Sequence, residues 1–323
     1  MKEITFTQAI TEAVDEEMAK DSNVIVMGED VRNWGAPLGE LTGLYDKYGA
    51  RVKDTPISET AILGSAIGAA ATGLRPIAHI MFVDFCGVCG DELLNQLQMR
   101  YMYGGKAELP LTIMSYCGAG ISAAAQHSKT LYGWLMCIQG LKIVAAATPY
   151  DAKGLLKSAI RENNPVIFLE HKVLIFGTAK QEVPDEEYTI PLGKADIKRE
   201  GSDVTVVALQ LMVQRALTAA EELQQKGISI EVIDPRTLAP LDKETILKSV
   251  KKTGRLVVLS EEPITGSAAG EIAAIVADEG YDSLKAPIKR VCAPDTPIPF
   301  GANLEKFWMP DEGKLIKAVT DMV

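Results

Sequence analysis

Thr55-Pro56-Ile57-Ser58-Glu59-Thr60 stands directly before a run of small and apolar residues that extends from Ala61 to Gly73. Pro56 favours an extended backbone before it, and Ser58 is a residue type whose side chain caps helix N-termini. The run that follows carries no charge, which predicts a helix buried on every side. The stretch therefore predicts one carboxylate, Glu59, at the N-terminal mouth of a deeply packed helix.

The position of Glu59 has two interpretations. An acidic residue in the first turn of a helix interacts favourably with the helix dipole and needs no further role. A carboxylate beside a closely packed element is otherwise costly, which favours a functional role. Gly64 and Gly68 would let a second helix approach closely, so the helix could lie at a contact between subunits. The residues alone leave both interpretations open.

Length and composition indicate a two-domain globular protein. The 323 residues fit two domains of about 150 residues each, and 47% are hydrophobic and 24% charged. A net charge of −10 argues against nucleic acid as a partner. The N-terminus lacks the apolar core of a signal peptide, and prolines and glycines interrupt the one long uncharged stretch, so we expect no membrane association. Five cysteines without a regular framework suit a reducing cytoplasm.

Strand-like and helix-like segments alternate along both halves of the chain. This alternation predicts an α/β fold in which each half has a mostly parallel sheet flanked by helices. A capping box at Thr5 and Gln8 predicts the start of the first helix, and another helix is expected from Asp91 to Tyr103. The polar, turn-prone residues 177–193 are expected to be a linker, which places the domains at 1–176 and 194–323. Strands are predicted at 24–27, 76–82, 111–116, 142–147, 166–170, 204–209, 229–234, 255–260 and 288–292.

Two short motifs match known binding or redox patterns but lack the neighbouring residues that those functions need. Gly118-Ala119-Gly120-Ile121-Ser122-Ala123 matches a dinucleotide-binding fingerprint, but no Asp or Glu occurs between Gly118 and Tyr150 to hold a ribose. Cys86-Gly87-Val88-Cys89 has redox spacing in an apolar context without a basic neighbour, which favours buried structural cysteines. Neither a nicotinamide site nor a metal site is predicted from these residues.

The chain contains three histidines in different settings. His79 lies within an apolar strand and is expected to be a satisfied core residue, whereas His171 ends a strand and could be structural or functional. His127 lies among small residues in an irregular segment after the glycine loop, where open parallel sheets place their sites. Histidine exchanges protons near neutral pH, so His127 is a candidate catalytic residue. Glu59 and His127 alone define no reaction.

Five stretches carry a family resemblance that runs essentially from end to end. The chain resembles the β subunit of thiamine-diphosphate-dependent 2-oxo acid dehydrogenases at Gly28-Glu29-Asp30, residues 54–59, 73–76, 124–128 and 151–155. The stretches 100–102, 104–107, 132–133, 190–198 and 293–300 are most similar to the acetoin dehydrogenase branch.

The resemblance implies a transketolase-like pyrimidine-binding domain followed by a transketolase-like C-terminal domain. It also implies an α2β2 heterotetramer that works with a lipoyl acyltransferase. The Gly-Asp-Gly motif with which the family binds diphosphate and Mg²⁺ is absent here. In heterotetrameric members that motif lies on the α chain, so the resemblance implies that the α subunit holds the diphosphate end of the cofactor. The Gly64 and Gly68 helix is then expected at a contact between β chains.

The resemblance assigns roles to individual residues. Glu59 matches the glutamate that hydrogen-bonds the aminopyrimidine ring, Phe85 matches the aromatic residue packed on that ring, and Ile57 and Glu29 match further residues of the cofactor site. His127 matches a histidine that handles protons near the acyl intermediate and the lipoyl group.

Further matches are of two kinds. Asp91, like Glu29, falls where the family has acidic residues between paired active sites. Residues matching a potassium site, mostly through backbone carbonyls, are Leu111, Ala159, Ile160, Glu162 and Asn164.

The implied reaction is the cleavage of acetoin to acetaldehyde and a hydroxyethyl carbanion on the cofactor, which passes oxidatively to the lipoyl arm of the acyltransferase. A β subunit that uses pyruvate or branched-chain 2-oxo acids is the alternative within the same class. A non-catalytic scaffold that docks the acyltransferase through its C-terminal domain is the alternative of a different class.

Overall fold

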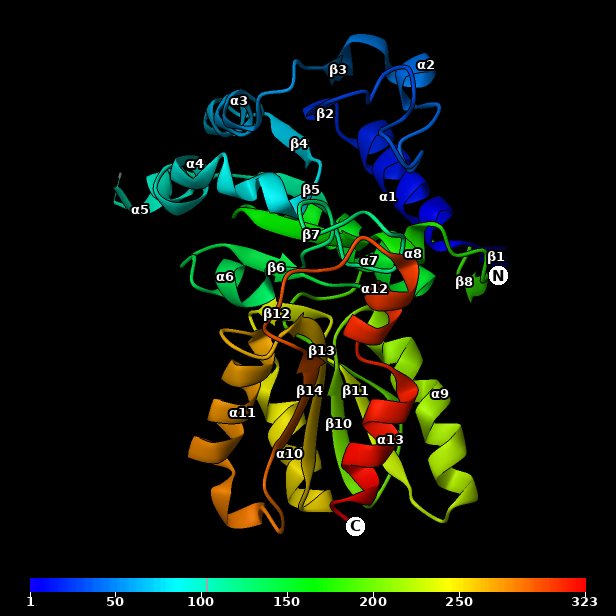
Figure 1. The fold of residues 1–323 in the computed structure, drawn as a ribbon. Coiled ribbons are helices and arrows are strands. Elements are labelled where there is room, and N and C mark those ends of the chain that lie inside the picture. Colours follow the sequence, from blue (N-terminus) through cyan, green and yellow to red (C-terminus); the bar gives the residue numbers. More distant parts are fainter. Residues whose placement is uncertain (103) are drawn as a thin grey trace. The chain divides into compact units, whose positions relative to one another are not determined.

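The computed structural model describes residues 1–102 and 104–323, which form two compact units. The first unit comprises Met1–Cys117 and Ile138–Leu192, and the second comprises Gly118–Cys137 and Gly193–Val323. Each unit has a mostly parallel sheet with helices on both faces (Figure 1). The α/β fold predicted from the alternating segments is confirmed.

The sheet of the first unit has the order β6-β7-β5-β4-β2-β3, and these strands are parallel. Every residue of β2, β5 and β7 is buried, as expected for strands covered on both faces. Because all strands run in one direction, their carboxyl ends lie along one edge. The bounds are β2 Val24–Gly28, β3 Val52–Asp54, β4 Arg75–Ile80, β5 Thr112–Cys117, β6 Lys142–Val144 and β7 Val166–His171; β1 Lys2–Ile4 and β8 Gln181–Val183 form a separate antiparallel pair.

Two long helices of the first unit pack against each other on one face of this sheet. They are α1 (Phe6–Lys20) and α7 (Pro149–Arg161), and the Nζ atom of the buried Lys157 lies 2.6 Å from an Oε2 atom of Glu16 between them. The shorter helices are α2 Leu44–Tyr48, η1 Gly49–Arg51, η2 Val83–Gly87, α4 Gly90–Leu94, η3 Gln96–Gln98, α5 Met99–Met102 and α8 Lys172–Ile175.

The predicted capping box at the start of α1 is confirmed and leads to a stability prediction. The Gln8 N–H donates to the Thr5 hydroxyl at 3.2 Å, and the Thr5 N–H donates to the Gln8 side chain at 2.9 Å. Replacing Thr5 with Ala removes one of these bonds and should lower the free energy of unfolding by about 1 kcal/mol in urea denaturation. Thr218→Ala is the matched control, since Thr218 lies exposed within a helix, and its free energy should stay within about 0.5 kcal/mol of the parent. Equal effects of the two variants would contradict the capping role.

Helix α3 (Glu59–Ala71) differs from the prediction in two respects. Ser58 occupies the N-cap position, but its side chain makes no capping hydrogen bond. The helix is also not buried on every side, because Ala61, Ser65 and Gly68 form an exposed face while Ile62, Leu63, Ala66, Ile67 and Ala70 face the interior. The run lacks charge, so periodicity could not separate the two faces. The predicted contact between β chains through this exposed face stays a prediction.

The prediction of one continuous helix from Asp91 to Tyr103 is wrong. The chain forms α4, then η3, then α5, and Tyr103 lies outside the described residues. The Asp91 carboxylate accepts hydrogen bonds from the Asn95 amide at 2.7 Å and the Gln96 amide at 3.0 Å. The break falls at Asn95, whose backbone (φ −118°, ψ −53°) departs from ideal helical geometry.

The second unit has a five-stranded sheet in the order β14-β13-β10-β11-β9, parallel except for the edge strand β9. Its strands are β9 Asp196–Arg199, β10 Val204–Ala208, β11 Ile230–Asp234, β13 Leu256–Pro263 and β14 Lys289–Ala293, and β12 spans Thr237–Ala239. Helices α9 and α13 contact each other on one face of this sheet, and α10 and α11 contact each other on the other (Figure 1). The helices are α6 Tyr132–Met136, α9 Leu211–Gln225, α10 Lys243–Thr253, α11 Ala268–Glu279, η4 Tyr281–Ser283, α12 Ala302–Trp308 and α13 Glu312–Thr320; α10 and α12 were not predicted.

The segment expected to be a linker is held against the first unit. The Ser158 hydroxyl donates to the Ile190 carbonyl at 2.6 Å, and the ring of Tyr188 stacks on that of Tyr150 with centroids 4.7 Å apart. Glu187 forms ion pairs with Lys20 and Arg161. The polar composition therefore predicted that this segment is irregular, but it did not predict that the segment packs against the first unit. The domain boundaries themselves stay a prediction.

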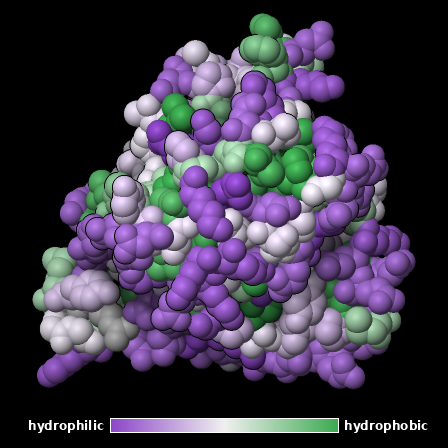
Figure 2. Space-filling model, turned by 90° about the horizontal axis from the view of Figure 1, so that it is seen from below, coloured by the Kyte–Doolittle hydropathy of each residue, from purple (hydrophilic) through white to green (hydrophobic). Residues whose placement is uncertain are grey.

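The surface is largely polar, as expected for a globular chain in which 24% of the residues are charged. The face in Figure 2 is mostly hydrophilic, with small scattered hydrophobic areas. Among the described residues, no helix is both long enough and apolar enough to cross a lipid bilayer.

Candidate functional site

Glu29 and Glu59 lie at the carboxyl edge of the first sheet. Glu29 directly follows β2, and the Thr55 N–H donates to the Gly28 carbonyl at 3.0 Å, which ties the segment before α3 to the end of β2. Glu59 is the first residue of α3. Loops at this edge of an open parallel sheet are where α/β proteins bind ligands. The predicted placement of Glu59 at a helix mouth is confirmed.

The two carboxyl groups are buried and influence each other. Glu59 is 8% exposed and Glu29 is 6% exposed. Burial raises the pKa of Glu29, and the neighbouring charges of Glu59 and Asp30 raise it further. Glu29 therefore keeps its proton to a higher pH than an ordinary glutamate. A protonated carboxyl group at this position can donate a hydrogen bond to a ligand atom.

Two apolar side chains belong to the same edge. Phe85 lies on η2, and the Thr60 hydroxyl donates to the Val88 carbonyl at 3.2 Å, which joins the start of α3 to the end of that helix. Phe85 is half-buried, whereas Ile57, two residues before Glu59, is 82% exposed. A carboxyl group and an aromatic ring at the same edge of a sheet are residue types that ligand sites commonly use.

His127 belongs to the second unit, in the segment Gly118–Cys137. Its side chain is half-buried, and its N–H donates to the Ala124 carbonyl at 3.3 Å in a tight turn. Ser122 and Ala124 have positive φ values of 56° and 61°, which favour glycine or asparagine and are costly for these residues. The surrounding structure therefore holds this loop in a defined conformation.

Three buried carboxylates fix the segment that carries His127. Each accepts a hydrogen bond from a backbone N–H of the segment, and none was identified from the sequence. Burial raises the pKa of Glu262 to about 7, although backbone donors oppose this shift. The pairs are Ala119 with Glu261 at 2.5 Å, Ser122 with Glu305 at 2.8 Å and Gly133 with Glu262 at 2.8 Å.

The close approach at Gly133 provides a test of this anchoring. A Cβ atom at Gly133 would lie 2.0 Å from the Gly266 carbonyl oxygen, so the backbone would have to move. Gly133→Ala should lower the free energy of unfolding by more than about 2 kcal/mol in urea denaturation. Gly301→Ala is the matched control, because its Cβ would meet nothing within 4 Å. Parent-like stability of the Gly133 variant would show that the segment is not held closely there.

The match to known proteins follows the two halves of the chain. Residues 2–176 match the model of the transketolase pyrimidine-binding domain, and residues 193–315 match that of the transketolase C-terminal domain. The β subunit of acetoin:2,6-dichlorophenolindophenol oxidoreductase from Bacillus subtilis is 49% identical, over 99% of this chain and 97% of that protein. The chain belongs to this family of transketolase-type dehydrogenase β subunits.

Other relatives of this β subunit agree with that membership. The corresponding acetoin oxidoreductase subunit of Cupriavidus necator is 49% identical, over 98% of this chain and 96% of that protein. The pyruvate dehydrogenase E1 component subunit beta of Bacillus subtilis is 44% identical, over 98% of each chain. A solved structure described as a split gene transketolase, inactive beta4 tetramer, has a TM-score of 0.81 at 23% identity and covers 99% of this chain and 98% of its own, which supports the fold.

The residues matched to a potassium site lie at the opposite edge of the first sheet in this β subunit. They surround the C-terminal end of α7, where the helix dipole attracts cations, and the carbonyls of Leu111 and Ala159 accept from the Val166 and Glu162 N–H groups at 2.9 and 3.2 Å. The Arg75 guanidinium already donates to the carbonyls of Ile160 and Glu162, each at 3.2 Å. The Glu162 carboxylate is paired with Lys142 at 2.6 Å and accepts from the Asn164 amide at 2.8 Å. Each of these four carbonyl oxygens already accepts a hydrogen bond, so a second lone pair on each oxygen is what a cation could use.

The other sequence-based expectations have mixed outcomes. Cys86 and Cys89 are buried free cysteines, as expected.

His171 is buried, and its Nδ1 accepts from the Val173 N–H at 3.2 Å, so it has a structural role as a helix cap. Asp91 is exposed, whereas the next residue, Glu92, is buried against α3 near Gly64. Both residues lie in α4, and the face that this short helix turns inward could not be read from the sequence.

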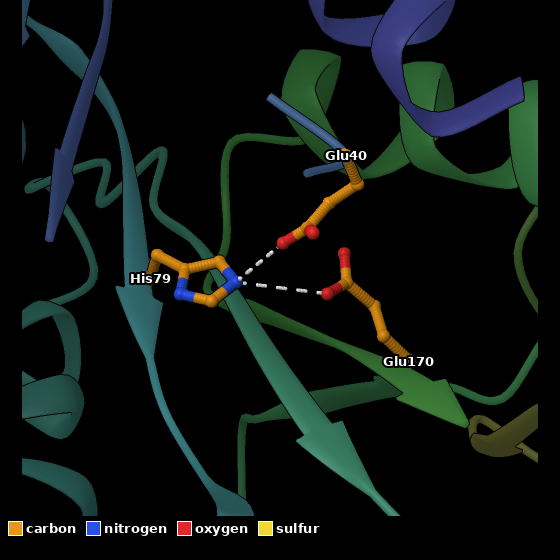
Figure 3. A group of neighbouring side chains, drawn as sticks. All are labelled: Glu40, His79 and Glu170. Carbon is orange, nitrogen blue, oxygen red and sulfur yellow. Dashed lines mark ion pairs between the residues drawn. The ribbon is translucent and has the colours of Figure 1, made fainter. Parts of the chain in front are cut away.

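His79 is buried as expected, but it is only partly a satisfied core residue. Its Nε2 atom forms an ion pair with Glu40 Oε1 at 3.0 Å, whereas Nδ1 has no hydrogen-bond partner among the described residues. The ring faces the carboxylates of Glu40 and Glu170 (Figure 3). This cluster could not be read from the sequence, because its three residues lie 39, 91 and 130 positions apart along the chain.

Proposed function

We propose that this chain is the β subunit of a thiamine-diphosphate-dependent acetoin dehydrogenase that is active together with an α subunit. The observation that carries the proposal is the buried Glu59 at the mouth of α3, with Glu29 beside it, in the pyrimidine-binding domain. The two relatives at 49% identity named for acetoin oxidation favour acetoin as the substrate.

The residues at the carboxyl edge fit the pyrimidine end of that cofactor. Glu59 would hydrogen-bond a ring nitrogen, Phe85 would pack on the ring, and Ile57 would cover it. Glu29 would help to keep a proton within the carboxyl pair, since burial and the charge of Glu59 raise its pKa. When bound, thiamine diphosphate supplies the nucleophile that cleaves the bond between the two oxygen-bearing carbons of acetoin and releases acetaldehyde. His127 would move a proton where the two-carbon group leaves for the lipoyl arm.

Two partners complete the proposal. An α subunit would hold the diphosphate and Mg²⁺, because the sequence has no Gly-Asp-Gly motif for them, and the assembly would be an α2β2 heterotetramer. A lipoyl acyltransferase would accept the two-carbon group. We place this assembly in the cytoplasm, in line with five free cysteines and bacterial relatives.

The experiment that tests the substrate is reconstitution with the α chain that co-purifies with this chain. Turnover is followed by reduction of 2,6-dichlorophenolindophenol with acetoin, pyruvate or branched-chain 2-oxo acids as substrate. We expect the highest kcat/KM with acetoin. A higher value with pyruvate would favour the alternative that the 44% identical pyruvate dehydrogenase subunit supports. Lack of turnover with every substrate would favour the scaffold.

We also propose that K⁺ binds backbone carbonyls at the C-terminal end of α7. The cation would share this site with Arg75, which contacts two of the five matched residues. The midpoint of thermal unfolding should be higher by about 2 °C or more in KCl than in choline chloride at the same ionic strength. NaCl serves as the control for general salt effects, and equal midpoints in the three salts would contradict the site.

A further inference from the structure

A histidine and two glutamates meet inside the first unit, away from its surface. His79 lies on β4, Glu170 on β7 and Glu40 in the loop between β2 and α2. All three side chains are 0% exposed. The His79 Nε2 atom lies 3.0 Å from Glu40 Oε1 and 3.7 Å from Glu170 Oε2, and both carboxylates point toward it (Figure 3). The cluster is therefore a closed polar site within a packed core.

The site lacks hydrogen bonds to an unusual degree. Three buried atoms of the cluster have neither a hydrogen-bond nor an ion-pair partner among the described residues: Glu40 Oε2, His79 Nδ1 and Glu170 Oε1. The neighbouring Tyr116 hydroxyl donates to the other Glu40 oxygen and leaves these three unsatisfied. Buried polar atoms are nearly always paired in native proteins, so a group of three at one place indicates a missing component.

The residue types and spacing identify that component as a cation. One ligand atom from each side chain can be chosen so that all three lie within 4.8 Å of one another. An ion with bonds of about 2.0–2.2 Å to nitrogen and oxygen brings its ligand atoms to such separations after a small adjustment. Two carboxylates supply two negative charges, which one divalent ion balances without exposing any group to water. Imidazole with carboxylates suits Zn²⁺ and related first-row metals.

We propose that Glu40, His79 and Glu170 bind one divalent first-row metal ion, with Zn²⁺ as the expected occupant. The ion has a structural role, because the ligands are fully buried and a substrate has no access to it. It joins β4, β7 and the loop after β2 behind Glu29. The proposal does not depend on which substrate the enzyme uses.

The test measures metal in the co-expressed α/β complex after growth with added Zn²⁺ and extensive dialysis. Elemental analysis should find about one Zn²⁺ per β chain above any metal that the α chain holds. His79→Gln and Glu170→Gln should each lower the β-chain Zn²⁺ content at least tenfold. Glu182→Gln, an exposed residue of the same unit, is the matched control and should keep the parental content. Parental content in both cluster variants would overturn the proposal.

A second measurement does not need folded variants. The parent complex is unfolded, freed of metal with a chelator and refolded with its α chain in the presence of Co²⁺, Zn²⁺ or chelator alone. We expect visible absorption bands of Co²⁺ bound in a low-symmetry site, and a higher midpoint of thermal unfolding with Zn²⁺ than with chelator. Metal-free parent protein with identical midpoints in all three conditions would contradict the proposal. Protons or a buried water would then satisfy the cluster.

Discussion

Glu59→Gln should lower the kcat of acetoin oxidation by the reconstituted α/β enzyme about 10²- to 10⁴-fold. Gln keeps the size of the side chain and its hydrogen-bonding reach, but it cannot exchange a proton at the ring nitrogen. The side chain is 8% exposed, so water cannot readily replace the lost carboxyl group. The measurement is the steady-state rate of 2,6-dichlorophenolindophenol reduction with saturating acetoin and thiamine diphosphate.

Two further variants give the Glu59 result its meaning. Glu182→Gln changes an exposed carboxylate of the same unit and should keep parental kcat. Glu29→Gln removes the neighbouring carboxyl group and should shift the pH profile of kcat. Its residual kcat should be larger than that of Glu59→Gln, because Glu29 acts on the reaction only through Glu59. If Glu59→Gln retained more than about half of the parental kcat with normal cofactor binding, Glu59 would not be the proton-exchanging group.

His127→Ala should produce the second large effect and should separate two half-reactions. With the lipoyl acyltransferase as acceptor, we expect turnover to fall about 10²- to 10³-fold, because the histidine is proposed to move a proton during transfer to the lipoyl arm. With 2,6-dichlorophenolindophenol as acceptor, that transfer is bypassed, and the loss should be at most about tenfold. Both rates are measured on one preparation of the α/β enzyme.

The control for His127 is its exposed neighbour. Gln126→Ala changes the same loop without removing the imidazole, and both rates should remain near the parental values. Equal losses in the two assays for His127→Ala would indicate a role in binding or in holding the loop rather than in transfer. Parental rates in both assays would remove His127 from the site.

The regular elements of the fold could largely be predicted because their signals are local. The capping box at Thr5 and the buried strand 24–27 depend on neighbouring residues, and both are confirmed. The prediction of a single helix at 91–103 failed because the backbone departs from helical geometry at Asn95, which a helical residue pattern does not reveal. The predicted burial of α3 on every side failed for a different reason. A segment without charged residues has no periodicity that marks its exposed face.

The candidate site was only partly readable for a related reason. Glu59 stood out because its own stretch predicts a helix mouth, and the structure places it there. The neighbourhood of His79 depends on residues brought together by sheet order, so a core role was the natural expectation. The carboxylates that anchor the loop of His127 come from β13 and α12, far along the chain. Long-range packing, and not residue type, distinguishes these groups from ordinary acidic residues.

The central claim is that Glu59 activates the cofactor by proton exchange with its pyrimidine ring. The most direct measurement is the rate at which the C2 proton of bound thiamine diphosphate exchanges with deuterium, determined by quenched-flow NMR on the α/β enzyme without substrate. The account predicts an exchange rate at least about 100-fold lower in Glu59→Gln than in the parent. Equal exchange rates in the two proteins, with the cofactor fully bound to both, would contradict it.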